Sequence, residues 1–348
     1  MATTSMIVVF LCKNASGTYK IAELECLILR PRLVRTWYEE GLSMKKGWTY
    51  IRLLAAAVFW GASFNAGELA IQAMPPLTVT AWRFIIATIL MLLLFLAKER
   101  PSWGSIRSSL WVYILLGTVG VFVTNALQFT ALKFTQPLHP ALIMATNPIL
   151  TSILAVPLLK ESIRIRQIIG MLCSMVGVLF VITNGVLSQI ASISLGDFFA
   201  MGANITWALY GVLGRKLLRG STPLATSTMT MAVATVCFLP FANHFTADVS
   251  RASLTIAWVS IVFMGTFGAV LTFLWWNQGI AKVGASRTSV FFNLVPVVTL
   301  ILSALMGKSM GWIQVTGTFA VILGVITAIG NVRGGARKEV IANTERSL

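Results

Sequence analysis

Hydrophobic residues occur in ten long stretches between residues 48 and 331, and most polar residues lie in the short connections between them. Each stretch is close to the ~20 residues that a helix needs to cross a bilayer. The stretches are too long and too continuous for the alternating strands of a membrane barrel. The pattern therefore predicts ten membrane-spanning helices, at residues 53–72, 77–97, 110–131, 138–158, 167–184, 196–214, 223–243, 254–277, 285–306 and 312–331.

The first five hydrophobic stretches resemble the last five once the chain is shifted on itself by about 147 residues. After an odd number of crossings the chain re-enters the membrane from the opposite side, so the second copy begins upside down. The predicted fold is an all-α integral membrane protein with ten transmembrane helices in two inverted five-helix repeats, an arrangement that recurs in transporters. Residues that match between the copies include Trp60 with Trp207, Pro76 with Pro223, Gly120 with Gly268, Pro148 with Pro296, and Gly170 with Gly317.

The composition excludes a water-soluble domain, because only 11% of the 348 residues are charged and 57% are hydrophobic. Soluble domains carry about 25% charged residues. In lipid the backbone has to satisfy its own hydrogen bonds, which agrees with the predicted helices. A net charge of +16 is compatible with nucleic-acid binding, but its distribution along the chain argues against that interpretation.

Basic residues gather on one side of the predicted helices. With Lys45 in the cytoplasm, eighteen Lys and Arg residues lie on the cytoplasmic side, whereas Lys133, Arg251 and Lys308 lie on the other. An excess of basic residues in short cytoplasmic loops is a strong topology signal. It predicts a multi-pass protein of the cell membrane, embedded in the lipid bilayer, with both termini in the cytoplasm and no nucleic-acid partner.

Residues 1–43 differ from the rest of the chain. Their hydrophobic run, 6–12, is too short to span a membrane, and it does not follow the basic start of a signal peptide. Met44 precedes two lysines and a predicted span, which is the pattern of an ordinary membrane-protein start. We expect either that Met44 is the natural initiator or that 1–43 is an N-terminal tail. Residues 332–348 are predicted to be a basic cytoplasmic tail.

Short motifs follow one another in a characteristic order through both repeats. They are residues 53–64, 131–135, 141–148 with Lys160-Glu161, 196–210, and 284–296. No single motif is diagnostic, but the ordered set resembles the drug/metabolite transporter superfamily in its EamA-like branch. The resemblance covers two EamA-type repeats, at 48–184 and 195–331.

This resemblance implies ten helices and the export or exchange of small metabolites such as amino acids. The family often has a Gly-Glu pair after its ninth helix, whereas this chain has Gly307-Lys308. A carboxylate function at that place is therefore in doubt. The chain has no phosphate-binding loop motif, so we do not expect it to contain a nucleotide-driven pump.

Two charged residues lie inside predicted helices, where a charge is costly and marks a candidate functional site. Glu68 lies about one turn, and Arg83 about two turns, from the outer ends of the first two helices. These helices are antiparallel neighbours, so the two side chains have similar depth. In a functional interpretation, Arg83 binds a substrate carboxylate, and Glu68 binds the substrate amine or a coupling proton. In a structural interpretation, the two side chains form a salt bridge or extend to the lipid headgroups.

Amide side chains also occur at membrane depth in both repeats. An amide that faces lipid lacks partners, so each is expected to face another helix or a polar cavity. Each either joins two helices or, as one of a set, lines a substrate pathway at the midplane. Pro148 and Pro296 occupy matched positions in the two repeats. Each is expected to produce either a kink or a local break that frees a backbone carbonyl. The amide candidates are Asn65, Asn125, Gln128, Asn147, Asn204, Asn277, Gln278 and Asn293.

Trp60 and Trp207 match between the repeats and lie in the middle of predicted helices, away from the interfacial belt where tryptophan usually occurs. A buried indole needs a partner for its N–H group. Together with Tyr210, Trp275 and Trp276, they either pack in the core or form the wall of a cavity for an amphipathic solute.

These patterns predict a secondary transporter for a small-molecule substrate, working by alternating access and without a cofactor. Proton antiport through Glu68 and facilitated flow are both open as driving mechanisms. A channel, a facilitator or a non-transporting membrane scaffold is the alternative. A membrane enzyme is not expected, because the two histidines and the remaining carboxylates are scattered over different loops and assemble no metal or acid–base site.

Overall fold

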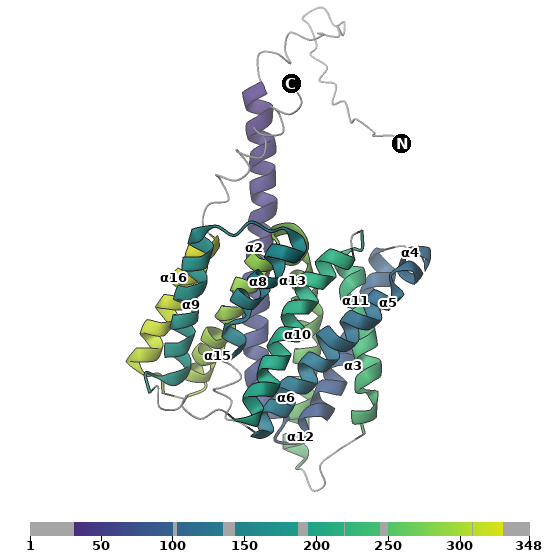
Figure 1. The fold of residues 1–348 in the computed structure, drawn as a ribbon. Coiled ribbons are helices and arrows are strands. Elements are labelled where there is room, and N and C mark those ends of the chain that lie inside the picture. Colours follow the sequence, from purple (N-terminus) through teal and green to yellow (C-terminus); the bar gives the residue numbers. More distant parts are fainter. Residues whose placement is uncertain are drawn as a thin grey trace, which may run out of the picture. The chain divides into compact units, whose positions relative to one another are not determined.

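The structure is a computed structural model that describes residues 31–99, 103–134, 143–186, 194–218, 220–243, 250–307 and 309–329. Residues 1–30, Lys308 and the predicted tail 332–348 lie outside the described part. The chain divides into two units at Gly47, and both predicted repeats belong to the second unit. Every element in the described ranges is helical (Figure 1). The first repeat begins within α2 (Pro31–Ala70), at residue 48. It continues through α3 (Pro76–Lys98), α4 (Trp103–Ser108), α5 (Leu110–Leu115), η1 (Leu116–Val123), α6 (Thr124–Phe134), α8 (Asn147–Leu159) and α9 (Ile165–Thr183).

The second repeat follows the first in its main helices but differs in its short elements. After α9, the chain continues through α10 to α16, with three short non-α segments named η3, η4 and η5. The elements are α10 (Leu195–Leu217), α11 (Pro223–Phe238), η3 (Leu239–Phe241), α12 (Arg251–Gly265), η4 (Thr266–Leu271), α13 (Thr272–Val283), α14 (Ala285–Ser289), η5 (Val290–Asn293), α15 (Leu294–Leu305) and α16 (Trp312–Ile329).

Several helices begin where the local sequence favours a helix start. Pro76 and Pro223, which match between the repeats, occupy the first turns of α3 and α11. Proline is favoured there because the first helical N–H groups have no partner within the helix. The side chain of Asp197 accepts a hydrogen bond from the Ser194 N–H at 2.7 Å and so supports the start of α10.

Eight helical stretches in the described ranges are long and apolar enough to cross a membrane. Of the ten predicted spans, two lie outside this group. Helix α8 has 13 residues, and the start of the predicted span 138–158 lies outside the described residues. Helix α10 has 23 residues but carries Asp197 in its first turn and Arg215 and Lys216 in its last. The structure therefore supports a multi-pass helical membrane protein, with eight spans that meet the criteria of length and composition.

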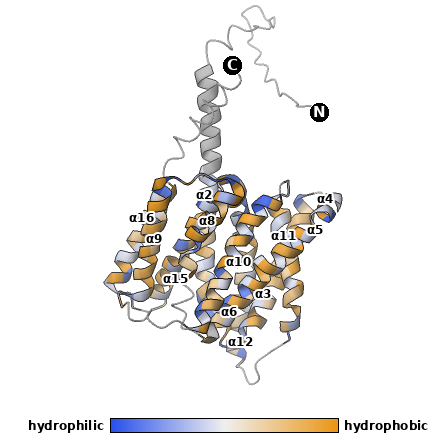
Figure 2. Cartoon of the chain, viewed as in Figure 1, coloured by the Kyte–Doolittle hydropathy of each residue, from blue (hydrophilic) through white to orange (hydrophobic). Residues whose placement is uncertain are grey.

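The outward faces of these helices are apolar. Leu93 on α3 is 60% exposed, Val236 on α11 is 65% exposed and Phe319 on α16 is 63% exposed. Figure 2 shows hydrophobic residues along most of the length of these helices. Apolar exposure on this scale is unfavourable in water and marks a surface that contacts a membrane.

Equivalent helices of the two repeats pack against each other in opposite directions. On α3 and α11, Phe84 contacts Phe238 and Met91 contacts Thr228, so the residue numbers rise along one helix as they fall along the other. Helices α9 and α16 behave in the same way, because Gly170 lies against Ala328 and Gly177 lies against Val321. Figure 1 shows α9 and α16 side by side. The equivalent helices are thus antiparallel.

Contacts also join residues that are equivalent in the two repeats. The hydroxyls of Thr88 and Thr235, which are 147 positions apart, hydrogen-bond to each other at 2.7 Å. The Cys173 thiol donates to the carbonyl of residue 320, again 147 positions away, at 3.5 Å. Self-matched contacts of this kind arise where a two-fold axis relates two copies, because a residue on the axis meets its own equivalent.

The third hydrophobic stretch of each repeat contains a π-helical segment, η1 in the first and η4 in the second. A Cβ atom added to Gly120 would lie 2.7 Å from the ring of Tyr210, and one added to Gly268 would meet the Ser63 hydroxyl. Gly120 matches Gly268, and Ser63 matches Tyr210. Each π-helical segment therefore contacts the first helix of the other repeat through a glycine. Such segments are frequent at functional sites.

Candidate functional site

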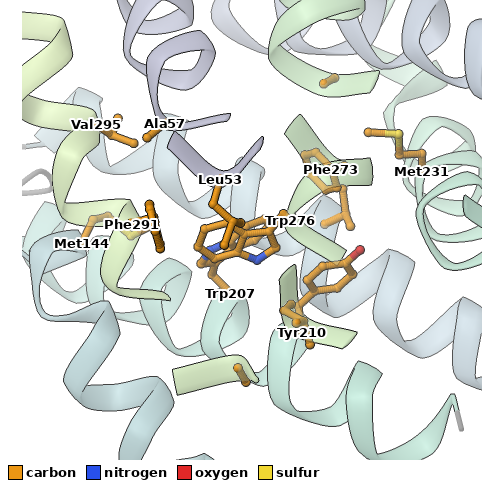
Figure 3. Close-up of a cluster of buried hydrophobic side chains, with 14 of the residues drawn as sticks. Leu53, Ala57, Met144, Trp207, Tyr210, Met231, Phe273, Trp276, Phe291 and Val295 are labelled. Atoms are coloured by element: carbon orange, nitrogen blue, oxygen red, sulfur yellow. The ribbon is translucent and has the colours of Figure 1, made fainter. Parts of the chain in front are cut away.

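Five aromatic rings from separate parts of the chain pack together inside the helix bundle. Figure 3 shows Trp207, Phe273 and Trp276, which belong to this group. Trp60 lies edge-on to its repeat equivalent Trp207, with ring centroids 5.7 Å apart. Its ring centroid is 5.0 Å from that of Trp276 and 5.5 Å from that of Phe292. Phe273 completes the group, 5.6 Å from Trp207. The predicted grouping of Trp60, Trp207 and Trp276 is present, and we refer to the five rings as the central aromatic cluster.

The indole N–H of Trp207 has no partner in the cluster. The side chain is only 6% exposed, and no acceptor among the described residues reaches its Nε1 atom. A buried donor without an acceptor costs about 1–3 kcal/mol. Native proteins retain few such groups, so this N–H is a candidate contact for a bound molecule.

Tyr210 and Asn277 form a polar network beside the central aromatic cluster. The Asn277 amide donates to the hydroxyls of Tyr210 and Ser227, each at 2.9 Å. Tyr210 stacks on Trp207, with ring centroids 5.4 Å apart. The network joins α10, α11 and α13, all from the second repeat, and fixes the orientation of the Tyr210 hydroxyl next to the cluster.

Arg83 contacts an amide and an aromatic ring from neighbouring positions in the bundle. Its Nη2 atom donates to the Asn125 side-chain oxygen at 2.9 Å, and the guanidinium carbon lies 4.9 Å from the centre of the Phe84 ring. Its Nε atom is buried without a hydrogen-bond partner. Glu68 is exposed on α2. The hydrogen-bond partner of Arg83 in the described part of the chain is thus the amide of Asn125.

Several predicted amides form hydrogen bonds between helices. The amide nitrogen of Asn147 donates to the Asn204 side-chain oxygen at 2.7 Å and so joins α8 to α10. Asn65 on α2 accepts from Ser303 on α15 at 2.9 Å. Asn293 donates to Ser174 on α9 at 2.8 Å, and its own side-chain oxygen is buried without a partner. These bonds match the interpretation that the amides connect helices.

The two matched prolines lie next to interruptions of regular helix. Pro148 is in the first turn of α8, directly after a turn at Thr146. Pro296 is in the first turn of α15, directly after the 3-10 segment η5. At Pro148 the interruption is a turn, whereas Pro296 lies in a continuous helical stretch, Ala285–Leu305, in which only the type of helix changes.

Three other predicted residues lie apart from the cluster. Trp275 stacks with Phe59, with ring centroids 6.0 Å apart, and Gln278 accepts a hydrogen bond from Arg52 at 2.8 Å. Gln128 is half-buried on α6. Conversely, sequence reasoning missed Phe273 and Phe292. Phenylalanine is common in membrane helices, so only the three-dimensional arrangement distinguishes these two rings from the others.

An ion pair joins the two repeats at one end of the bundle. The guanidinium of Arg215, at the end of α10, lies 2.8 Å from the carboxylate of Glu161, which follows α8. The same carboxylate accepts hydrogen bonds from the backbone N–H groups of Ala285 at 2.9 Å and Ser286 at 3.2 Å. Glu161 therefore binds the first turn of α14 as well as α10, and it connects the first repeat to two parts of the second.

Comparison with known proteins identifies relatives across most of the chain. The family model for the EamA-like transporter family matches twice, at residues 47–183 and 194–330. The uncharacterized transporter YyaM of Bacillus subtilis is 43% identical over 287 residues, covering 82% of this chain and 94% of that protein. The uncharacterized inner membrane transporter YhbE of Escherichia coli is 26% identical and covers 82% of this chain and 92% of that protein.

A solved structure described as "Crystal structure of protein" has a similar fold. Its TM-score is 0.67 at 20% sequence identity, and the match covers 81% of this chain and 97% of that chain. At this identity the likeness concerns the fold alone. The family model, however, matches both repeats, and a relative is 43% identical over nearly its whole length. The chain therefore belongs to the EamA-like transporter family.

Proposed function

We propose that this transporter is a secondary carrier that exports small amphipathic metabolites, such as amino acids, across the cell membrane by alternating access. Its two repeats are inverted in the bilayer, with ten crossings and both termini in the cytoplasm. In this proposal α8 and α10, which are respectively short and more polar than the eight candidate spans, complete the ten. The strongly asymmetric distribution of basic residues supports the orientation.

The antiparallel packing of equivalent helices is the observation that carries this proposal. Helices α3 and α11 are equivalent and run in opposite directions, as do α9 and α16. Copies related in this way have opposite orientations in a membrane. Two such halves can exchange conformations, so that a site between them opens to one side and then to the other.

The solute site in this proposal is the region of the central aromatic cluster. Trp60 belongs to the first repeat, whereas Trp207 and Trp276 belong to the second, so a rocking motion of the repeats changes the contacts between these rings. Aromatic side chains bind the apolar part of a solute, and neighbouring polar groups orient it. Tyr210, Asn277 and the unpaired N–H of Trp207 supply such groups.

A transport assay tests the proposal. Cells that overproduce the protein are screened for efflux of, or resistance to, added amino acids and related metabolites, and a positive solute is then measured in proteoliposomes by counterflow. A carrier gives uptake that saturates with solute concentration and is accelerated by the same solute inside the vesicle. A linear, non-exchanging flux indicates a channel and contradicts alternating access. An imposed pH gradient in the same vesicles distinguishes proton antiport from facilitated flow.

A further inference from the structure

Arg83 is a half-buried cation inside a membrane helix, and no opposite charge in the described part of the chain balances it. It lies seven positions after Pro76, the first residue of α3, which places it about 10 Å along the helix. No carboxylate among the described residues lies within ion-pairing distance of its guanidinium. A charged side chain at membrane depth is costly, and it normally pairs with an opposite charge or forms part of a substrate pathway.

The contacts of the guanidinium orient it without neutralising it. Asn125 accepts from Nη2 at 2.9 Å and donates its own amide N–H to the Val121 carbonyl at 2.8 Å. Because the amide nitrogen is engaged by a carbonyl of η1, the amide oxygen is directed toward Arg83. The ring of Phe84 lies beneath the guanidinium carbon, at 4.9 Å. An amide dipole and an aromatic face hold an arginine in place, but neither supplies a full negative charge.

The donors that remain at Arg83 fit a carboxylate. Nε is buried and unpaired, and the guanidinium presents five N–H groups in a planar fork. This fork matches the two oxygens of a carboxylate, which it binds through parallel charge-assisted hydrogen bonds. A lysine at the same position would present a point charge and lose that geometry.

The surroundings of Arg83 also fit the apolar body of such a ligand. Phe84 contacts Phe273 edge-on at 6.3 Å, and Phe273 lies 5.6 Å from Trp207 in the central aromatic cluster. Aromatic contacts therefore run without interruption from the guanidinium to the indole whose N–H is unpaired. Both unpaired groups at the ends of this path, Arg83 Nε and Trp207 Nε1, are donors, and a solute with acceptor oxygens satisfies donors.

We infer that Arg83 binds the carboxylate of an anionic solute whose apolar body contacts the central aromatic cluster, and that Asn125 is the positioning residue for the guanidinium. This inference rests on the proposed function and specifies its substrate class as monocarboxylates with an apolar body. It assigns Arg83 a binding role in place of the structural salt bridge with Glu68.

The test uses the full-length protein in detergent and three probes that share a phenyl ring on a three-carbon chain and differ in the terminal group. They are 3-phenylpropanoate, 3-phenylpropanamide and 3-phenylpropylammonium. Binding is measured by quenching of tryptophan fluorescence and by the shift in Tm. We expect the wild-type protein to bind the carboxylate at least tenfold more tightly than the amide or the ammonium compound. Arg83→Lys is expected to weaken carboxylate binding about tenfold, and Arg83→Met to abolish the preference. Arg251→Gln, at an exposed arginine, is the matched control and leaves all three affinities unchanged.

A second variant separates binding from a structural role. Asn125→Asp places a carboxylate 2.9 Å from the guanidinium, so it is expected to raise Tm and to abolish carboxylate binding together. Arg83→Met, which removes an unbalanced charge, is expected not to lower Tm. Equal binding of the three probes, absence of carboxylate binding, or a preserved preference in Arg83→Met or Asn125→Asp overturns the inference.

A counterflow assay with the same proteins distinguishes failure of the carboxylate site from failure of the carrier proposal. Saturable counterflow of other solutes without any carboxylate preference overturns the carboxylate site and leaves the carrier proposal in place. Binding of 3-phenylpropanoate through Arg83 without counterflow of any solute overturns the carrier proposal and leaves the site.

Discussion

Trp60 and Trp207, the tryptophans that match between the two repeats, meet edge to face with ring centroids 5.7 Å apart. The same separation of 147 positions relates the two hydroxyls of Thr88 and Thr235, which hydrogen-bond at 2.7 Å. Residues that a duplication placed far apart in sequence are thus neighbours in space. Because each repeat supplies one member of each pair, neither repeat can form this interior alone.

The first prediction concerns the indole N–H of Trp207. Trp207→Phe removes an unpaired buried donor but also leaves space in a packed cluster. The two effects offset each other in part, so we expect a stability loss of no more than about 2 kcal/mol. Transport should respond more strongly, with a higher KM and little change in the maximal rate, because the N–H contributes to solute binding. Thermal unfolding and counterflow measure the two effects. Trp312→Phe, at a residue that is 85% exposed, is the control and should alter neither.

The second prediction concerns the packing of α9 against α16. A Cβ atom on Gly324 would lie 2.5 Å from the backbone nitrogen of Ser174, and the backbone cannot move aside as a flexible side chain can. Gly324→Ala should therefore lower stability by about 1–3 kcal/mol, the typical cost of overpacking. Gly104→Ala on α4 is the control, because no atom lies within 4 Å of the added carbon. Equal Tm values for both variants contradict close packing of the two helices.

The third prediction concerns the reciprocal glycine contacts of η1 and η4. Gly268→Ala brings a methyl group against the Ser63 hydroxyl and should lower Tm. Removing that hydroxyl in the double variant Gly268→Ala/Ser63→Ala should restore most of the loss, which a double-mutant cycle measures as a coupling energy. Gly120→Ala meets the ring of Tyr210 instead, so Tyr210→Phe should give no such rescue. If the changes in stability caused by Gly268→Ala and Ser63→Ala simply add, a direct contact between the two residues is contradicted.

The fourth prediction concerns Glu161, whose carboxylate binds Arg215 and the first turn of α14. Since both side chains are partly exposed, losing the ion pair should cost only about 1 kcal/mol. Exchanging the charges, Glu161→Arg with Arg215→Glu, should still fail to restore stability, because an arginine cannot accept the N–H of Ala285. Recovery of the wild-type Tm in the exchanged variant contradicts the dual role of Glu161.

Sequence patterns predicted the membrane helices and the repeat because lipid imposes long apolar segments, and duplication leaves matching Trp, Pro and Gly residues. They left the partner of Arg83 open between Glu68, a substrate and the lipid headgroups. Helix depth alone made Glu68 a neighbour, whereas the rotation of α3 and α6 about their axes, which depth cannot specify, directs Arg83 to Asn125.

Other features leave no signal in one sequence. The π-helical segments η1 and η4 resemble ordinary apolar helix, since the change is one of backbone hydrogen bonding rather than of composition. Phe273 and Phe292 enter the central aromatic cluster only through tertiary packing. The short described length of α8 and the polar residues of α10 explain why fewer than ten helices in the described ranges are long and apolar enough to cross a membrane.

The most direct test of the central claim, that two oppositely oriented repeats meet around the solute site, is the membrane side of the connection between them. A reporter that is active on only one side of the membrane is fused after residue 190, between α9 and α10, and after residue 220, between α10 and α11. The account predicts residue 190 outside the cell and residue 220 in the cytoplasm. A cytoplasmic residue 190 contradicts it, because the two repeats would then point the same way.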